Sequence, residues 1–295
     1  MNKEKIEGFI IKGIGGFYDV KSTDTGETIR CSLRGLLRLK NITPAIGDHV
    51  IVNQEDDGHY VIEEIKERRN YFLRPPVANV DTAVLVFSMN NPPPNFGVMT
   101  KLLVQCEYNK VEVILCFTKS DLAGEKALSN IQDYLYATDY PMYIVGFDEE
   151  RDRMIHEIRE RLIGKTSFLA GPSGTGKSTL INAMIPEAQM EIGEISKKVL
   201  RGRHTTRHVE LVPLEAGGAI VDTPGFTSIE LGENIERETL KYYFREFDNA
   251  GCKFNDCVHL NEPNCAIKKQ LERKEISPQR YKFYLQLLEK TENKY

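Results

Sequence analysis

Two short motifs hold the residues of this chain best suited to chemistry, and they occur in an unusual order. Residues 118–121 read Thr-Lys-Ser-Asp, and residues 171–178, later in the chain, read Gly-Pro-Ser-Gly-Thr-Gly-Lys-Ser. The later motif fits G-x-x-x-x-G-K-[ST], whose glycines allow backbone N–H groups to point at phosphate oxygens. The earlier motif has the form [NT]-K-x-D, in which the aspartate can accept hydrogen bonds from guanine. The phosphate loop ordinarily comes first, so the reversed order is itself informative.

The sequence around the phosphate loop is the one such a site requires. An apolar run at 167–170 precedes it, and a helical stretch at 176–185 follows. The start of a helix adds partial positive charge, so we expect Lys177 to reach the β- and γ-phosphates and Ser178 to ligate Mg²⁺. The predicted nucleotide contacts in this segment are Gly171, Pro172, Ser173, Gly174, Thr175, Gly176, Lys177, Ser178 and Thr179.

A second phosphate-side motif, Asp-Thr-Pro-Gly, occupies residues 222–225. It ends the apolar run 219–221, so Asp222 should emerge at the carboxyl edge of the sheet, where ligands bind in parallel α/β folds. We expect Asp222 to hold the Mg²⁺ shell through water and the Gly225 N–H to sense the γ-phosphate.

The Thr-Lys-Ser-Asp motif predicts a guanine site made by Thr118, Lys119, Ser120 and Asp121. Asp121 can accept from N1–H and the exocyclic amine of guanine; adenine offers no such pair, so the motif favours GTP over ATP. Lys119 can lie along the base and brace the phosphate loop. Thr118 replaces the commoner Asn and keeps one hydroxyl. A further base-contacting turn is expected near 142–146, but 145–148 reads Val-Gly-Phe-Asp, which matches S-A-[KL] poorly and receives no predicted side-chain role.

Hydrolysis requires a positioned water, which a Gln directly after D-x-x-G often provides. Phe226 occupies that place here and cannot do so. The substitute is sought at 202–206, Gly-Arg-His-Thr-Thr, where His204 can orient or polarise the water and Thr205 or Thr206 can complete the Mg²⁺ shell. A histidine in a polar loop is more often simply exposed, so both interpretations of His204 stay open.

A cluster near the C-terminus predicts a metal site. Cys252, Cys257, His259 and Cys265 offer three thiols and one imidazole within fourteen residues. Four such ligands suit one tetrahedral Zn²⁺ in a closed, structural site that staples a segment without a large core of its own. The other cysteines sit beside apolar residues, and we expect them to be buried and inert. They are Cys31, Cys106 and Cys116.

The elements that must position these residues fall into three predicted domains, 1–70, 71–232 and 233–295. The first has about five short runs rich in β-branched and aromatic residues, which suit a small OB-fold or SH3-like barrel. A linker is expected at 74–76. Beyond it, apolar runs at 83–87, 113–117, 142–145, 167–170 and 219–222 alternate with helical stretches at 97–109, 125–137, 151–163 and 176–185. That alternation predicts a parallel α/β sheet. The last part should be helical, ending in an amphipathic helix at 278–291 docked on another element.

Composition excludes several classes of protein. The chain has 295 residues, 41% hydrophobic and 28% charged, as in a soluble globular protein. No apolar run approaches the roughly 20 residues that span a bilayer, and no signal-peptide core is evident, so we expect no membrane partner and a cytoplasmic location. The formal net charge is only −4, but two acid-free basic stretches can contact phosphates. They are Lys197, Lys198, Arg201, Arg203 and Arg207, and Arg30, Arg34, Arg38 and Lys40.

Taken together, the barrel, the motif order and the Cys/His cluster resemble the circularly permuted ribosome small subunit-dependent GTPases of the RsgA/YjeQ type. The resemblance covers essentially the whole chain. It implies an α/β circularly permuted P-loop GTPase domain, preceded by an all-β OB-fold barrel and followed by a mostly helical zinc-binding domain. It also implies a monomeric late maturation factor of the 30S subunit that contacts 16S rRNA, with GTP hydrolysis stimulated by the subunit and coupled to release. In that family the histidine matched by His204 is proposed to act in catalysis.

Two alternatives remain at this stage: an ATP-using enzyme with the same phosphate loop, and an RNA-binding nucleotide switch without significant turnover. The permutation adds a structural expectation. All nucleotide loops of a parallel sheet gather at one edge, so chain order can change while the site does not. The cut after 222–225 leads the chain directly into the C-terminal domain, which predicts a route from nucleotide state to that domain.

Overall fold

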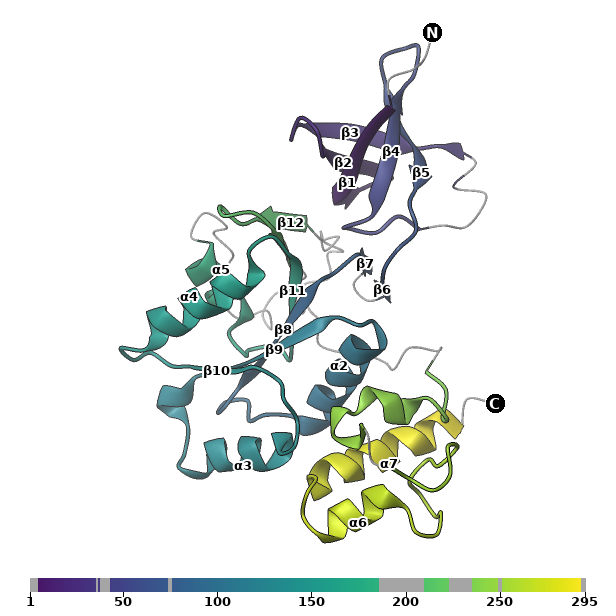
Figure 1. The fold of residues 1–295 in the computed structure, drawn as a ribbon. Helices are drawn as coiled ribbons and strands as arrows, with labels where there is room; N and C mark the ends of the chain where they lie inside the picture. Colours follow the sequence, from purple (N-terminus) through teal and green to yellow (C-terminus); the bar gives the residue numbers. More distant parts are fainter. Residues whose placement is uncertain are drawn as a thin grey trace, which may run out of the picture. The chain divides into compact units, whose positions relative to one another are not determined.

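The computed structural model describes most of the chain (Figure 1). The described residues are 5–35, 37, 43–73, 76–185, 210–222, 235–248 and 251–292. They form two compact units. Within the described residues, the first takes in the chain up to residue 83, 157–169 and 178–222, and the second takes in 84–156, 170–177 and the chain from 235 onward.

Five strands at the N-terminus close into a barrel, drawn from purple to blue in Figure 1. They are β1 (Lys5–Ile14), β2 (Phe17–Ser22), β3 (Thr28–Leu33), β4 (His49–Gln54) and β5 (Tyr60–Ile65). β1 pairs with both β2 and β4, while β3 runs parallel to β5 and β5 pairs with β4. Closure gives each of the five strands two neighbours within the barrel, and β1 also pairs with the strand at 210–213 through Lys12. This is the OB-like barrel that the short β-rich runs predict.

The barrel core consists of inward-facing aliphatic side chains with no solvent exposure. Among its members are Ile10, Val20, Val50, Val52 and Ile62. They come from different strands of the barrel, so the alternation of each strand places its apolar residues on one shared interior. Cys31 joins them, and burial raises the pKa of its thiol to about 12. The expectation of a buried, inert thiol at this position is confirmed.

Pro76, the last residue of the expected linker at 74–76, instead begins a strand. β6 (Tyr71–Leu73) pairs antiparallel with β7 (Pro76–Ala78), and residues 74 and 75 lie outside the described part of the chain. Pro76 is the first residue of its strand, a position where the missing N–H costs no ladder bond. Phe72 packs edge-on against Phe168, with ring centroids 5.0 Å apart. This contact joins residues far apart in the sequence, so the local Pro-Pro pattern could not predict it.

Three strands complete the first unit. β11 (Thr166–Ala170) pairs in parallel with β13 (Ala219–Asp222), in a register that sets Phe168 opposite Val221. β12 (Glu210–Pro213) runs antiparallel to β13 and was not anticipated from the sequence. It forms because Leu214, Gly217 and Gly218 make a tight turn that returns the chain along β13.

The second unit contains the sheet order β10–β9–β8. These strands are β8 (Thr82–Ser88), β9 (Glu112–Thr118) and β10 (Met142–Val145), with β9 and β10 parallel. Every residue of β8 is buried, as is β9 after its first residue. Helices α2 (Phe96–Tyr108) and α3 (Lys126–Leu135) lie in this unit, with the 3-10 turn η1 (Ser120–Leu122). Helices α4 (Arg151–Leu162) and α5 (Lys177–Met184) begin in it and continue in the first unit. The alternation of strands and helices predicted from the apolar runs is confirmed.

The C-terminal part mixes short turns with two helices. Its elements are η3 (Leu240–Tyr243), η4 (Arg245–Phe247), α6 (Ala266–Glu272) and α7 (Pro278–Glu292). α7, yellow in Figure 1, packs against α2 and α3, so the predicted docking of an amphipathic terminal helix is confirmed. Tyr284, Leu287 and Leu288 of α7 belong to one buried cluster with Val104 of α2. The C-terminal part therefore shares its core with the preceding domain. The division into 1–70, 71–232 and 233–295 stays a prediction.

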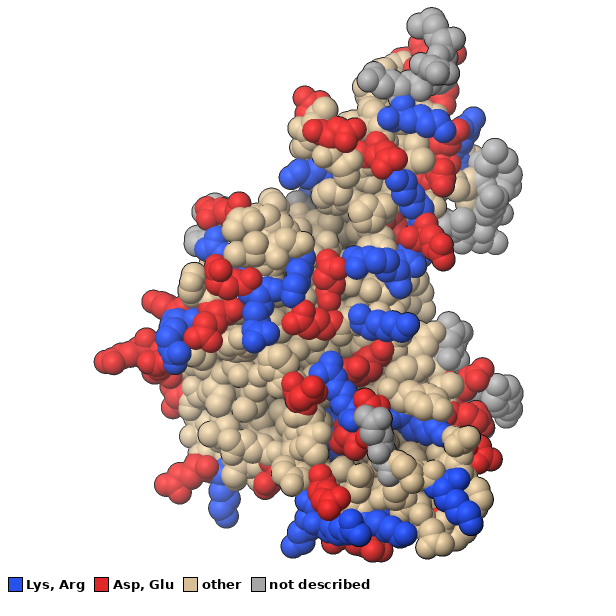
Figure 2. All heavy atoms as spheres, viewed as in Figure 1, with Lys and Arg blue, Asp and Glu red and all other residues tan. Residues whose placement is uncertain are grey.

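Acidic and basic side chains intermingle over the face of the molecule drawn in Figure 2. The predicted basic stretch in the barrel is partly neutralised, because Arg30 lies 3.5 Å from Asp19 of β2 and Arg34 lies 2.6 Å from Glu63 of β5. Arg38 and Lys40 lie outside the described residues, as does the basic stretch at 197–207. In the part of the chain that the structure describes, no helix is long and apolar enough to cross a membrane.

Candidate nucleotide site and metal centre

The phosphate loop is held against strand β8 by a glycine that no other residue can replace. Gly171 has φ of +145°, and a Cβ at this position would lie 2.0 Å from the Val86 carbonyl oxygen. Both the backbone conformation and the close approach require glycine. Thr175 is buried, and its Oγ1 donates to the Pro172 carbonyl at 2.9 Å, which closes the loop on itself. Ser173 and Gly174 are exposed at the tip, and Ser178 and Thr179 are half-buried in the first turn of α5.

Lys177 makes its hydrogen bonds to the loop itself in this structure. Its Nζ donates to the carbonyl oxygens of Gly171 at 2.9 Å and Pro172 at 2.7 Å. These partners are neutral, so they do not offset the loss of water around the ammonium, and burial lowers the pKa of Lys177 to about 8. A phosphate group in the loop would supply the missing negative charge and raise that pKa.

Two side chains of the Thr-Lys-Ser-Asp segment tie it to the phosphate loop. Thr118 Oγ1 donates to the Thr175 carbonyl at 2.6 Å. Lys119 Nζ donates to the Gly174 carbonyl at 2.8 Å and to the Asn91 carbonyl at 2.6 Å. The two motifs, far apart in sequence, thus form one site. The Thr118 hydroxyl, which stands where the motif more often has the Asn amide, makes one of these links.

The turn that follows β10 lies directly against Asp121, although its sequence gave no predicted side-chain role. The Phe147 N–H donates to Asp121 Oδ1 at 3.2 Å. A Cβ on buried Gly146 would lie 2.4 Å from Ser120 Oγ, so a larger residue would require the Ser120 side chain to move. Asp121 itself is exposed. The rejection of adenine argued from the sequence depends on burial of this carboxylate, and the protein alone does not bury it.

A loop after β8 also belongs to the site and was missed at the sequence level. Besides the Asn91 carbonyl that binds Lys119, Asn90 donates from Nδ2 to the Leu122 carbonyl, beside Asp121. The signal that could have found it is the Asn-Asn-Pro turn at 90–92, placed after a buried strand at the carboxyl edge of the sheet.

Other predicted site residues are placed only in part. Asp222 ends β13, whose residue Val221 lies level with Phe168 of β11, so Asp222 stands at the carboxyl edge next to the strand that leads into the phosphate loop. Gly225, His204, Thr205 and Thr206 lie outside the described residues. The Mg²⁺ set that combines Ser178, Thr205 or Thr206, and Asp222 therefore stays a prediction.

The four predicted metal ligands converge on one point. The Nδ1 atom of His259 lies 3.6 Å from Cys252 Sγ, 3.3 Å from Cys257 Sγ and 3.5 Å from Cys265 Sγ, and the Cys252 and Cys265 sulfurs are 3.9 Å apart. A tetrahedral zinc with ordinary Zn–S and Zn–N bonds would separate its ligands by about 3.8 Å for two sulfurs and about 3.6 Å for sulfur and nitrogen. All four ligand atoms lie within 4.8 Å of one another. The cluster fits a zinc ion.

Surrounding groups clamp the loop that carries His259. Glu262 accepts from the N–H groups of Val258 at 2.6 Å and Leu260 at 2.8 Å. From α7, Tyr281 donates to the His259 carbonyl at 2.6 Å and Tyr284 to the Val258 carbonyl at 2.7 Å. Such hydrogen bonds around the ligands fix their orientation. Burial also lowers the pKa of His259 to about 4, which keeps the imidazole neutral and able to bind metal.

Two arginines of the C-terminal part, Arg280 and Arg245, contact the helices before it. Arg280 of α7 and Glu246 of η4 pair with both side chains fully buried. The Arg280 guanidinium lies 5.4 Å from the ring centroid of Tyr134 in α3. Nearer the surface, Arg245 pairs with Glu107 of α2 at 2.7 Å and Asp139 at 2.8 Å. The metal centre and the base-side helices are therefore parts of one packed body.

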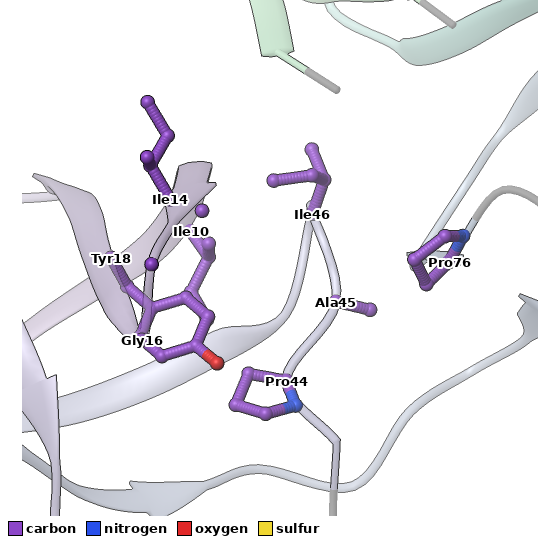
Figure 3. Close-up of a pocket in the computed structure, with 10 residues that line it drawn as sticks. Ile10, Ile14, Gly16, Tyr18, Pro44, Ala45, Ile46 and Pro76 are labelled. Carbon is purple, nitrogen blue, oxygen red and sulfur yellow. The ribbon is translucent and has the colours of Figure 1, made fainter. Parts of the chain in front are cut away.

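A cavity of about 320 Å³ opens beside the barrel, away from these chemical groups (Figure 3). Tyr18 and Pro44 face one another across it, with Ile46 on the same loop as Pro44. Among the described residues, its lining holds apolar side chains, glycines and one tyrosine, Tyr18.

These features define a P-loop nucleotide-binding protein whose base-reading motif precedes its phosphate loop. The family model described as RsgA GTPase matches residues 65–232, and that described as RsgA N-terminal domain matches residues 7–62. The chain belongs to the RsgA GTPase family, a family of GTP-hydrolysing enzymes. Its fold is that of a circularly permuted GTPase with an OB-like barrel.

Relatives extend over the whole length of the chain. The small ribosomal subunit biogenesis GTPase RsgA of Clostridium beijerinckii is 44% identical over 96% of this chain and 97% of its own, and that of Clostridium perfringens is 42% identical over 98% and 99%. The crystal structure of YjeQ from Thermotoga maritima superposes with a TM-score of 0.84 at 34% identity, covering 99% of this chain and 100% of the other. YloQ, a circularly permuted GTPase, gives 0.79 at 36% identity, covering 99% and 96%.

Proposed function

We propose that this protein hydrolyses GTP as a late assembly factor of the small ribosomal subunit, in the cytoplasm and as a monomer. The observation that carries the proposal is the junction of the two motifs, where Thr118 and Lys119 donate to carbonyls of the phosphate loop. Base recognition and phosphate binding are thereby joined in one rigid site. The names of the relatives, which place them in biogenesis of the small subunit, supply the biological setting.

Guanine selection is assigned to Asp121, with Lys119 alongside the base. Asn in place of Asp121 exchanges one hydrogen-bond acceptor for a donor. The substitution should therefore weaken the binding of GTP and strengthen that of xanthosine triphosphate, whose C2 carries an oxygen acceptor. Competition of GTP, ATP and xanthosine triphosphate for the wild type and Asp121→Asn tests this assignment. A variant that keeps its preference for GTP would remove Asp121 from base reading.

Hydrolysis is assigned to the region between the phosphate loop and Asp222. Mg²⁺ held by Ser178, by Thr205 or Thr206 and, through water, by Asp222 would neutralise charge on the phosphates. His204 would orient the attacking water once the ribosomal subunit has fixed its loop. Single-turnover hydrolysis measured with and without purified 30S subunits is the decisive experiment, because a nucleotide switch without turnover shows no acceleration. His204→Ala should abolish the stimulated rate and leave GTP affinity unchanged.

The barrel is proposed to face 16S rRNA. OB-like barrels bind RNA with one sheet face, and Arg30 and Arg34 remain 59% and 44% exposed despite their carboxylate partners. Exposed ion pairs of this kind contribute little to stability, so phosphates can displace the carboxylates at small cost. The Arg30→Ala/Arg34→Ala double variant should weaken 30S binding, with a shallower dependence of affinity on salt.

Zinc is proposed as the resident ion of the Cys₃His centre, with a structural role. With four protein ligands, the ion has no open position for a substrate. Its loop packs under α7, which rests on α2 and α3. Ile235, the first described residue after the second phosphate-side motif, is buried in the same core cluster as Val104 of α2. This supports a route by which nucleotide state reaches the C-terminal domain and drives release.

A further inference from the structure

The ring of Phe147 has no role in the site as described so far. It lies just after β10 and is 72% exposed, although its own N–H donates to Asp121 Oδ1 at 3.2 Å. Covering a large apolar ring that is exposed to water lowers the free energy. One backbone hydrogen bond therefore places this residue next to the carboxylate assigned to base reading.

Asp121 needs a cover if it is to discriminate between bases. An exposed carboxylate that loses a base donor can bond to water instead, so adenine would incur little penalty. Discrimination becomes strong only where the unpaired group is shut off from water. The described residues leave Asp121 exposed. A group that closes over the bound base at this position would supply the missing desolvation.

The turn that carries Phe147 is held in place rather than loose. Gly146 is buried against Ser120. On the other side, Asp148 Oδ1 accepts from the Glu150 N–H at 3.1 Å, and the Asp148 carbonyl accepts from the Arg151 N–H at 3.2 Å as α4 begins. The Arg151 guanidinium lies 4.9 Å from the centroid of the Phe147 ring. The ring thus contacts a side chain of α4, while most of the surface of Phe147 stays exposed among the described residues.

We propose that Phe147 is a base-contacting residue that packs on the guanine and shields its hydrogen bonds with Asp121 from water. The inference rests on the proposed function, since it takes Asp121 to read guanine. Aromatic rings bind nucleobases by stacking without selecting among them. Selectivity in this site arises because the ring excludes water from a carboxylate that only guanine can satisfy.

The test uses the full-length protein and the variant Phe147→Ala. Titration calorimetry gives the affinities for GTP, for ATP and for inorganic tripolyphosphate, which has no base. We expect the affinity for GTP to fall about tenfold, the size of one lost stacking contact, and the preference for GTP over ATP to narrow. Tripolyphosphate should bind as to the wild type. Phe147→Tyr should retain both affinity and preference.

A matched control is Phe254→Ala. Phe254 is also an exposed phenylalanine, 42% exposed, with a cation, Lys253, 5.7 Å from its ring centroid. It lies in the C-terminal part near the metal ligands, so its removal should leave nucleotide selectivity unchanged. If Phe254→Ala lowers GTP affinity as much as Phe147→Ala, the effect is general and the proposal is wrong.

The outcomes separate this inference from the function on which it rests. Wild-type affinity and preference in Phe147→Ala overturn the inference, and so does an equal loss of GTP and tripolyphosphate binding, which would mean damage to the phosphate loop. If Asp121→Asn gains affinity for xanthosine triphosphate while Phe147→Ala leaves all nucleotide affinities unchanged, the guanine assignment stands and only the inference fails. If Asp121→Asn gains no affinity for xanthosine triphosphate, the guanine assignment is wrong, and the inference that rests on it is wrong as well.

Discussion

The nucleotide site and the Cys₃His centre are both built on short motifs, but their functional groups stand in different states. In the metal centre, the four ligand atoms already lie within 4.8 Å of one another, and the Tyr281 and Tyr284 hydroxyls clamp the His259 loop. In the nucleotide site, Lys177 bonds to carbonyls of its own loop and Asp121 accepts from a neighbouring N–H. The functional groups of the nucleotide site are therefore hydrogen-bonded within the protein, and a ligand must replace these hydrogen bonds.

The difference follows from the source of each arrangement. The metal ligands are held by a hydrophobic cluster shared with α2, so the geometry comes from packing over long sequence distances. The phosphate loop takes its shape from its own glycines, from local hydrogen bonds and from the bonds of Thr118 and Lys119 to its carbonyls, and it must release and rebind a charged ligand in each cycle. The ligands of a structural metal centre are expected to be in place before the metal binds. The groups of a catalytic site must instead exchange hydrogen-bond partners between the protein and the substrate in each cycle.

The strongest way to test the comparison is to remove a metal ligand. Cys257→Ala should reduce bound zinc from one ion per chain to none, because three remaining ligands cannot close the tetrahedron. The binding free energy of structural zinc is folding free energy, so the C-terminal part should lose several kcal/mol of stability and its ordered far-ultraviolet circular dichroism. Metal analysis and thermal melts measure both effects.

The control for that experiment is another buried cysteine. Cys116 lies in β9, outside the cluster, and burial raises the pKa of its thiol to about 12. Cys116→Ala should keep one zinc per chain, with only the modest loss expected of a small cavity. If Cys257→Ala retained stoichiometric zinc, the assignment of the four ligands would be wrong.

A smaller loss of stability is expected when the buried ion pair between Arg280 and Glu246 is broken. Arg280→Ala leaves Glu246 buried and unpaired, which should cost roughly 3–5 kcal/mol. Faster hydrogen exchange of the α7 amides would measure this loss. The apolar pair Arg280→Met/Glu246→Leu should recover much of it. Arg153→Ala is the matched control, since Arg153 and Glu150 pair with side chains 62% and 63% exposed, and it should cost under about 1 kcal/mol.

Within the nucleotide site, the burial of Lys177 makes GTP affinity depend on pH. The free protein holds this ammonium with a pKa of about 8, and bound phosphate should raise the value. Below pH 8 the proton is already present and affinity should be flat. Above pH 8 binding must take up a proton, so affinity should fall by up to about tenfold per pH unit.

Calorimetry in buffers of different ionisation enthalpy should accordingly detect proton uptake at pH 8.5 and almost none at pH 6.5, with Mg²⁺ held constant. Lys177→Arg keeps its charge throughout this range and should lose the slope. An identical slope in wild type and Lys177→Arg would assign the titration to another group and would weaken the contrast between the two sites.

The smallest expected effect comes from the hydroxyl that links the two motifs. Thr118→Val keeps the shape of the side chain but removes the hydrogen bond to the Thr175 carbonyl. A net loss of about 1 kcal/mol, or roughly fivefold in GTP affinity, is expected for such a bond. Thr118→Ser retains the hydroxyl and should bind GTP like the wild type. An unchanged affinity in Thr118→Val would mean that other contacts suffice to hold the loop.

Much of this protein was accessible from sequence because its signals are local. The strand 167–170, the glycines of the phosphate loop and the first turn of α5 are contiguous, so their spacing alone predicts their conformation. The same holds for the five barrel strands and for the Cys/His cluster, whose ligands lie within fourteen residues. The fold class and the GTPase family were predicted correctly on these grounds.

The tertiary structure decided whatever depends on contacts between distant segments. Pro76, expected in a linker, begins β7, which pairs with the strand that carries Phe72 against Phe168. The basic stretch of the barrel has carboxylate partners on other strands. The turn at Phe147, which matched its motif poorly, proved to bond to Asp121. Sequence specifies which groups can react, because local spacing fixes local backbone. Their partners are set by packing, which brings together residues whose separation along the chain carries no signal.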